Sequence, residues 1–469
     1  MRKVLSLSLL AVMVLLASCS DSNDYRNIVP QNAKVIMRID GKAFYSQTGI
    51  NRDKLIGDII EASGNEEDLN KIADLGIDCD APVYGFVGDN VLSCGSAGLL
   101  AKVSDRSKFE ERMAEGELEK EDIDGVSVYS SNHMRDVVIG VSDEAVLVLG
   151  PAYDDQKKLK KQLVAMLNRE NADNNPSDNE LFKRAEKADA ILSLYADLSV
   201  VPDAAWNFVR RIMTEGGQAD VLNVEELQTF TYGLDVTASD HILNTNLWWL
   251  SSDEQVQEKY NAQLQCMRKV DNTALGLFTA RTVLGMAMNF DGDAMLAANK
   301  KAIDDVLAQS GEAGEYVAIM FELMKQVDGN MLFGVDDFET FDGGLAIVTT
   351  GDEDAITECL TNVGLPKPAT RDGKLVFNLG DELPFRLSLD DKLFVATMQQ
   401  DAEARINGNS NLASPMLDQI KDNKFTFFLN LQRGMEIAEE SGALRGQIRE
   451  IVDAFAEFFD NVHFVSITY

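Results

Sequence analysis

The chain has 469 residues, of which 45% are hydrophobic and 26% are charged, and these globular proportions exclude wholesale disorder, collagen and a coiled-coil rod. The 43 Lys and Arg against 77 Asp and Glu give a net charge of −34. Because phosphate contacts need clustered basic side chains, this charge excludes a nucleic-acid-binding protein, and we expect no nucleic-acid partner. The length, about three typical domains of ~150 residues, predicts one to three domains.

The first residues are typical of a secretory signal peptide. Arg2 and Lys3 precede a nearly uninterrupted apolar run, Val4–Leu16, which is too short to span a membrane as a helix. The next segment, Leu16-Ala17-Ser18-Cys19, resembles a bacterial lipobox, in which the signal is cleaved before the cysteine and the thiol is acylated. We expect residues 1–18 to be a cleaved signal peptide and Cys19 to be the lipidation site. An ordinary signal peptide with an incidental cysteine is the alternative.

A polar tether follows, so that residues 19–29 are expected to comprise the lipidated Cys19 and this tether. Ser20 stands where lipoprotein sorting rules place an inner-membrane Asp, and this resemblance favours the outer membrane. Asp21 and Asp24 resemble, in diluted form, the surface-export signal of Bacteroidetes lipoproteins. We therefore expect a lipid-anchored protein of the outer membrane, either periplasm-facing or exposed at the cell surface. The membrane is a partner through the lipid anchor only, because no later stretch reaches 18 apolar residues.

Residues 30–240 have the pattern of a first α+β unit. It opens with an alternating strand at Ala33–Asp40 and a helix-like run that continues from Gly41 to Ile60. Further strands and helices are predicted at 82–89, 98–103, 125–130, 137–149, 154–168, 180–198, 203–213 and 230–235. The alternating strands and short turns favour antiparallel sheet with one face covered by helices.

Residues 241–270 are expected to form an added strand, His241–Ser251, and a connecting helix, Asp253–Met267. Trp248 and Trp249 lie in this strand, where neighbouring side chains face opposite sides of the sheet. An exposed tryptophan could contact a sugar or a protein partner, so both are candidate contact residues. Burial under the connecting helix is the alternative.

Residues 271–469 repeat the pattern of the first unit. Asp40-Gly41 aligns with Asp291-Gly292, Gly98 with Gly343, and the hairpin 137–149 with 385–397. A long helix is predicted at Gly434–Phe459. The sequence thus predicts an internal duplication: an α+β fold of two tandem related units of antiparallel sheet with packed helices, after a cleaved lipoprotein signal peptide.

A family resemblance follows from these features. The lipobox, the strand in PQNAKVIMRID, the helix after it and the duplicated units resemble a group of Bacteroidetes lipoproteins catalogued only as a domain of unknown function. The resemblance implies a bacterial source and carries no catalytic signature.

The sequence offers few residues for catalysis. His133, His241 and His463 are far apart in the chain, and no zinc-binding, phosphate-binding or dinucleotide motif is present. The Cys94-Gly95-Ser96 segment is interpreted as a tight turn. We therefore assign no catalytic, cofactor-binding or metal-ligating residue. Cys79 and Cys94 are either bridged or free thiols, and we make no assignment for Cys266 and Cys359.

The leading hypothesis is a lipid-anchored cell-envelope protein that acts as a non-enzymatic binding or interaction module, with an envelope protein or a glycan as its partner. The alternative is a hydrolase that uses a carboxylate pair in the cleft between the two units, because such a site needs only two acids a few ångströms apart.

Overall fold

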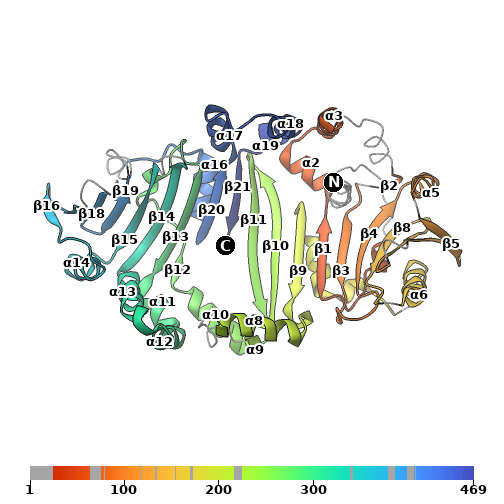
Figure 1. Ribbon diagram of the computed structural model, residues 1–469, viewed down its shortest axis with the longest axis horizontal. Coiled ribbons are helices and arrows are strands. Elements are labelled where there is room, and N and C mark those ends of the chain that lie inside the picture. The colour runs from red at the N-terminus through yellow and green to blue at the C-terminus, as the bar shows by residue number, and fades with distance from the viewer. Residues whose placement is uncertain are drawn as a thin grey trace.

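The computed structural model describes residues 25–63, 75–78, 80–116, 118–131, 135–153, 155–169, 173–215, 224–338, 342–378, 386–398, 406 and 408–469. These residues form an α+β fold with one large, mostly antiparallel sheet (Figure 1). Cys19, Cys79 and His133 lie outside the described residues. Within the described residues, no helix combines the length and the apolar character needed to cross a membrane.

The strands of the first half are β1 (Val35–Ile39), β2 (Ile77–Asp78), β3 (Val83–Val87), β4 (Ala97–Val103), β5 (Glu119–Ile123), β6 (Val126–Ser130), β7 (Val138–Val141), β8 (Ala145–Gly150), β9 (Leu192–Asp197) and β10 (Phe230–Ser239). Those that follow are β11 (Ile242–Ser251), β12 (Met267–Arg268), β13 (Leu284–Asp291), β14 (Val327–Asp337), β15 (Asp342–Thr349), β16 (Ala369–Arg371), β17 (Lys374–Phe377), β18 (Arg386–Asp390), β19 (Leu393–Thr397), β20 (Phe425–Asn430) and β21 (Phe464–Thr468).

The helices are α2 (Gly41–Thr48), α3 (Arg52–Ser63), α5 (Arg106–Ala114), α6 (Gln156–Leu167), α7 (Glu180–Lys187), α8 (Asp203–Glu215), α9 (Val224–Leu227), α10 (Glu254–Leu264), α11 (Gly292–Ala298), α12 (Lys300–Gln309), α13 (Gly314–Lys325), α14 (Glu353–Asn362), α16 (Ser414–Asp422), α17 (Leu431–Glu440), α18 (Gln447–Ala454) and α19 (Ala456–Asn461).

The strand pairings repeat in the same order in both halves. The first half pairs as β10–β9–β1–β3–β4–β8–β7–β6–β5. The second half pairs as β21–β20–β13–β14–β15–β19–β18–β17–β16. In the hairpin β7–β8 Val138 is opposite Leu149, and in β18–β19 Arg386 is opposite Thr397, as the sequence alignment predicts.

Strand β11 joins the two halves into one sheet. It pairs antiparallel with β10 and parallel with β21, and we call the β11–β21 pairing the seam. The strand expected at His241–Ser251 and the helix expected at Asp253–Met267 are thus present as β11 and α10. The predicted antiparallel sheet is present in both halves, but the two halves share one continuous sheet, and the pairing at the seam is parallel.

One further expectation is corrected. The helix predicted at Gly434–Phe459 is three helices, α17, α18 and α19, because Gly442 and Gly446 adopt left-handed φ angles of 71° and 56° between the first two.

Each half has its own core on one side of the sheet. In the first half α6 and α7 cover a cluster that includes Tyr84, Leu147 and Tyr195, all fully buried. In the second half α16 covers a cluster that includes Met416 and Phe428. Figure 1 shows α7 and α16 behind the strands, so the viewer looks onto the opposite side of the sheet.

Candidate functional site

The side of the sheet opposite α6, α7 and α16 is apolar and only half-buried. Along β20, for example, Thr426 and Phe428 are buried, whereas Phe425, Phe427 and Leu429, which face the other way, are partly exposed. A sheet with one covered face ordinarily alternates between apolar residues inside and polar residues outside. Here the outward residues are apolar as well.

We call this surface the apolar face. Its central members are Leu192, Leu194 and Ala196 from β9, Tyr232, Leu234 and Val236 from β10, Leu243, Thr245, Leu247 and Trp249 from β11, Val465, Ile467 and Tyr469 from β21 and the segment after it, Phe425, Phe427 and Leu429 from β20, and Leu284, Met286 and Met288 from β13. The same face continues as Val35, Met37 and Ile39 from β1 and Met331, Phe333 and Val335 from β14.

The apolar face is uncharged throughout these paired segments. Among its described members, Thr245 supplies the one aliphatic hydroxyl, and the polar atoms otherwise belong to aromatic rings. Tyr232, Leu247 and Phe333 remain 37%, 36% and 39% exposed. Contiguous exposed apolar patches of this kind are typical of surfaces that interact with a ligand, a partner or a membrane.

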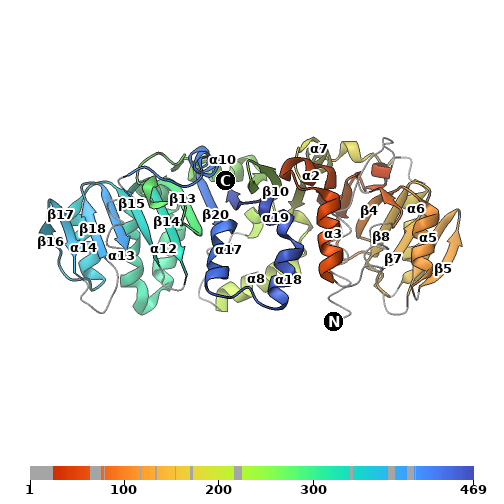
Figure 2. The ribbon, with the colours of Figure 1, turned by 90° about the horizontal axis from the view of Figure 1, so that it is seen from above.

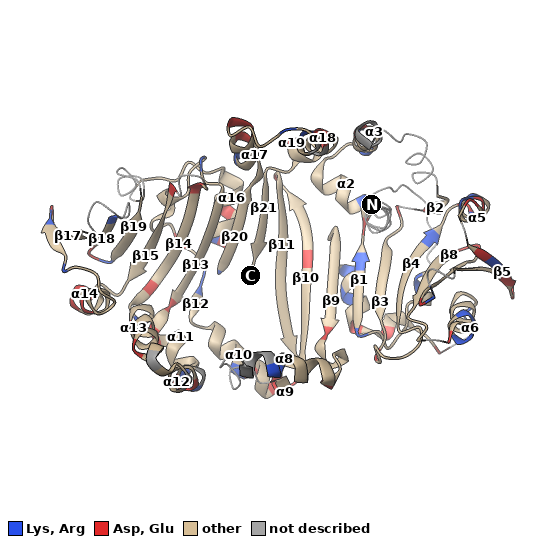
Figure 3. Cartoon of the chain, in the orientation of Figure 1, with Lys and Arg blue, Asp and Glu red and all other residues tan. Residues whose placement is uncertain are grey.

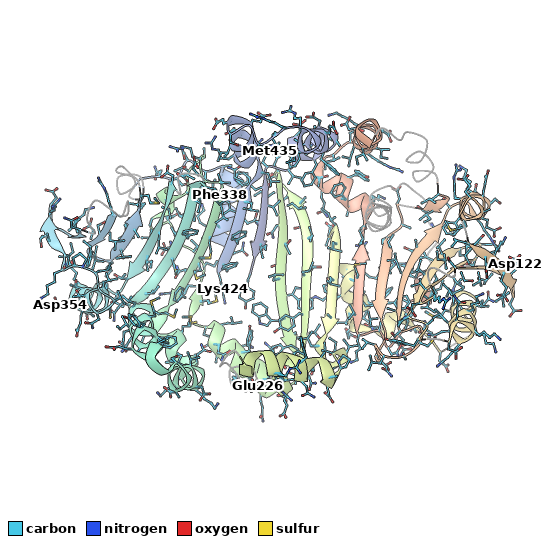
Figure 4. The ribbon with its side chains drawn as sticks, viewed as in Figure 1. Asp122, Glu226, Phe338, Asp354, Lys424 and Met435 are labelled. Atoms are coloured by element: carbon cyan, nitrogen blue, oxygen red, sulfur yellow. The ribbon has the colours of Figure 1, made fainter. Side chains whose placement is uncertain are left out.

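Helices border the apolar face at both ends of the strands. Figures 1 and 2 show α17 and α18 at one end and α8 at the other, all standing forward on the open side. Figure 4 places Met435 on the first of these borders and Glu226 on the second. Figure 3 shows that Lys, Arg, Asp and Glu concentrate on the helices and the sheet edges and are sparse on the central strands.

The border helices are acidic. The segment 431–461, which forms α17, α18 and α19, contains seven acidic and three basic residues. At the opposite end, α9 and α10 with the helix-capping Asp253 contain five acidic residues and the single base Lys259, which pairs with Glu226.

An aromatic cluster occupies the α10 end of the apolar face. Trp249 stacks on Tyr469 with ring centroids 4.2 Å apart and meets the edge of Tyr260 at 5.4 Å, and Tyr232 lies 6.4 Å away. Burial raises the pKa of Tyr260 to about 12, and the neighbouring Tyr232 and Tyr469 add to the shift. These phenols are therefore neutral hydrogen-bond donors at physiological pH.

Trp248 lies on the other side of the sheet, as expected for a neighbour of Trp249. Its Nε1 donates to Asp235 Oδ2 at 3.2 Å, and the Arg184 guanidinium sits 3.4 Å from its ring centroid. Asp235 Oδ1 also accepts from Ser193 Oγ at 2.7 Å and from Tyr195 Oη at 2.6 Å. Gly233 opposite is required, because a Cβ there would lie 2.1 Å from the indole ring. Both tryptophans are partly exposed, each within a packed cluster.

A polar groove of 670 Å³ lies on the same side as Trp248, between the two halves. Its walls include Asp235, Asn244, Asp418, Gln419 and Asp422. Asp418 pairs with Lys421, and Asp422 lies 3.6 Å from Lys269. These carboxylates are thus engaged by hydrogen-bond donors or by lysine ammonium groups.

The structure also brings together two histidines that the sequence separates. His241 and His463 stack with ring centroids 4.2 Å apart at the end of the seam, and each ring donates one N–H bond to a backbone carbonyl, Asn461 O and Asp460 O respectively. Only the parallel pairing of β11 with β21 creates this contact, so no sequence spacing could have indicated it. In the described residues, no group of three His, Cys, Asp or Glu side chains is arranged to hold a metal ion.

The described cysteines are free thiols. Cys94 lies in the predicted turn before β4, where Gly95 has a left-handed φ of 69°. Burial raises the pKa of Cys94, Cys266 and Cys359, which favours the protonated thiol at neutral pH.

Comparisons with known proteins give distant structural matches alone. No family model and no curated protein matches the chain. Two crystal forms of TP0453, a Treponema lipoprotein, match in structure. Crystal form IV is 15% identical in sequence, with a TM-score of 0.27, and the match covers 47% of this chain and 77% of TP0453. Crystal form III is 13% identical, with a TM-score of 0.26, and the match covers 53% of this chain and 88% of TP0453.

Proposed function

We propose that this chain is a non-enzymatic binding module whose ligand or partner covers the apolar face. The observation that carries the proposal is the row of half-exposed apolar side chains across the centre of the sheet, where an unoccupied protein would place polar ones. Covering these side chains would contribute roughly 25 cal/mol of binding free energy for each Å² of apolar surface removed from water.

The rival proposal, a hydrolase with a carboxylate pair between the halves, has weaker support. A general acid must hold a proton, which requires a carboxyl free of stabilising donors. Two acids of the polar groove are instead engaged, Asp235 by three hydrogen bonds and Asp418 by Lys421. This arrangement favours a structural role for these two acids.

We also propose that Cys19 carries a lipid anchor at the outer membrane and that the two halves arose by duplication of one unit. The lipobox supports the anchor, and the identical order of strand pairing supports the duplication. The resemblance to the Bacteroidetes lipoproteins of unknown function remains part of this proposal.

A neutral solvatochromic dye such as Nile red tests the binding proposal. The unacylated Cys19→Ala chain should enhance its fluorescence, and Leu247→Asp should weaken dye affinity about tenfold by placing a charge on the apolar face. The matched control is Leu250→Asp, because Leu250 is 54% exposed on the same strand but faces the other way. Equal dye affinity of both variants, with circular dichroism unchanged, would refute the proposal.

Membrane fractionation tests the anchor. The native sequence expressed in a Gram-negative host should sediment with the outer membrane and label with palmitate. Cys19→Ala should appear in the soluble fraction without label, because a lipidated cysteine alone is proposed to supply the membrane affinity. Continued membrane association of Cys19→Ala would contradict the anchor.

A further inference from the structure

We infer that the occupant of the apolar face is a lipid, with its hydrocarbon chains along the strands and an ammonium-bearing headgroup beside the aromatic cluster at the α10 end. The inference rests on the proposed binding function and specifies its ligand. Three properties of the face support it: the lack of hydrogen-bonding capacity, the aromatic end and the charge of the border.

Away from the aromatic cluster, Thr245 is the one described member of the apolar face whose side chain can hydrogen-bond to a ligand. The main-chain groups of β9, β10, β11, β21, β20 and β13 point along the sheet and bond to neighbouring strands on both sides. The side chains above them are hydrocarbon, thioether or aromatic, with Thr245 as the exception. Hydrocarbon chains need no hydrogen bonds, and the flexible Met37, Met286 and Met288 adapt to their shape.

The aromatic cluster gives one end of the face a different character. Tyr and Trp rings are suited to a boundary between hydrocarbon and polar groups, because each has an apolar body and a polar tip. Within the part of the chain that the structure describes, the phenol oxygens of Tyr232, Tyr260 and Tyr469 bond to no protein group, so they are available as donors to a phosphate or ester oxygen. A ligand with one apolar body and one polar end fits this asymmetry.

Charge complementarity selects the headgroup. Glu225, Glu254 and Glu258 are exposed on α9 and α10, and α10 also carries Tyr260 of the aromatic cluster. The bases at this end are engaged: Lys259 pairs with Glu226, and Lys424, beside Tyr469, donates to the Leu264 carbonyl. These carboxylates attract an ammonium group and repel an anionic headgroup. A second copy of this chain would bring the same acidic border and a net charge of −34, so self-association over this face is disfavoured.

Lipid retention by the unacylated Cys19→Ala chain tests the inference. The chain is incubated with vesicles of phosphatidylethanolamine and phosphatidylcholine, or of phosphatidylglycerol and phosphatidylcholine, and is then separated from them by flotation. Mass spectrometry counts the lipid that stays with the protein. We expect phosphatidylethanolamine near a one-to-one ratio, in about tenfold excess over phosphatidylglycerol.

Two sets of variants locate the site. Leu247→Asp should abolish retention, and Leu250→Asp should preserve it. The double variant Glu254→Lys, Glu258→Lys should retain lipid but lose the preference for phosphatidylethanolamine, since the acidic border is replaced by a basic one.

Three outcomes would overturn the inference. The first is that the parent chain retains no lipid, and the second is that Leu247→Asp retains as much lipid as the parent chain. The third is that phosphatidylglycerol is retained as well as or better than phosphatidylethanolamine. If the chain retains no lipid but binds a basic amphipathic peptide at the apolar face, the face would be assigned to a protein partner instead. Dye binding that depends on Leu247 without lipid retention would leave the binding function standing and refute the lipid alone.

Discussion

Asp235 is the shared acceptor of a side-chain network at the centre of the sheet. Its carboxylate accepts from three side chains on two neighbouring strands, Ser193 and Tyr195 on β9 and Trp248 on β11. Ser193 and Tyr195 are fully buried, so both hydroxyls depend on Asp235 as their acceptor. Burial and the bond to Asp235 together raise the pKa of Tyr195 to about 12, which keeps the phenol protonated as a donor.

Asp235→Ala is expected to lower the free energy of unfolding by about 2–4 kcal/mol, because it leaves buried donors unsatisfied. Urea denaturation followed by tryptophan fluorescence measures the change. Asp418→Ala, which removes one exposed ion pair with Lys421, should cost no more than about 0.5 kcal/mol. Equal losses of unfolding free energy in the two variants would show that the Asp235 network stabilises the protein no more than an exposed ion pair does.

At the scale of elements, the first residues of helices could be predicted from the sequence. Asp40 precedes α2 and Asp291 precedes α11, and each carboxylate accepts from the backbone N–H three residues on, at 2.9 Å. Such an N-cap depends on a local side-chain type and spacing, so the aligned Asp-Gly pairs could be recognised directly. Helix breaks at left-handed glycines were missed in the 434–459 segment, because its apolar periodicity continues across Gly442.

The apolar face could not be predicted from strand patterns. In β20 the sequence Phe-Thr-Phe-Phe-Leu-Asn puts aromatic residues on both sides, and the pattern does not say which side helices cover. Both sides of Trp248-Trp249 were candidates for the same reason. Which side stays open depends on where α7 and α16 pack, and those are long-range contacts.

At the scale of the whole molecule, the seam couples the halves through a buried polar network. Asn244 on β11 donates to Thr468 Oγ1 at 3.0 Å and accepts from Ser466 Oγ at 2.9 Å, both on β21. Ser466 and Thr468 are buried, and Gln419 of α16 donates to Ser466 Oγ at 2.9 Å.

Asn244→Ala is expected to destabilise the protein by about 2–3 kcal/mol and to broaden its calorimetric unfolding transition, as the halves lose coupling. The matched control is Asn246→Ala, since Asn246 lies two residues along the same strand and side but is exposed. A sharp transition and unchanged stability in Asn244→Ala would show that the backbone pairing alone couples the halves.

Because of the seam, the central sheet can be completed only after β21 has been synthesised. Strand β21 is synthesised after every other strand of the sheet, and its contact with β11 joins positions 224 residues apart. Until β21 emerges, the outer edge of β11 presents unpaired N–H and C=O groups, which are a template for pairing with another chain. Large gaps in sequence make such pairings slow. The interval between the synthesis of β11 and that of β21 is therefore the period in which a nascent chain is most exposed to aggregation, and in which a holding chaperone would be most useful.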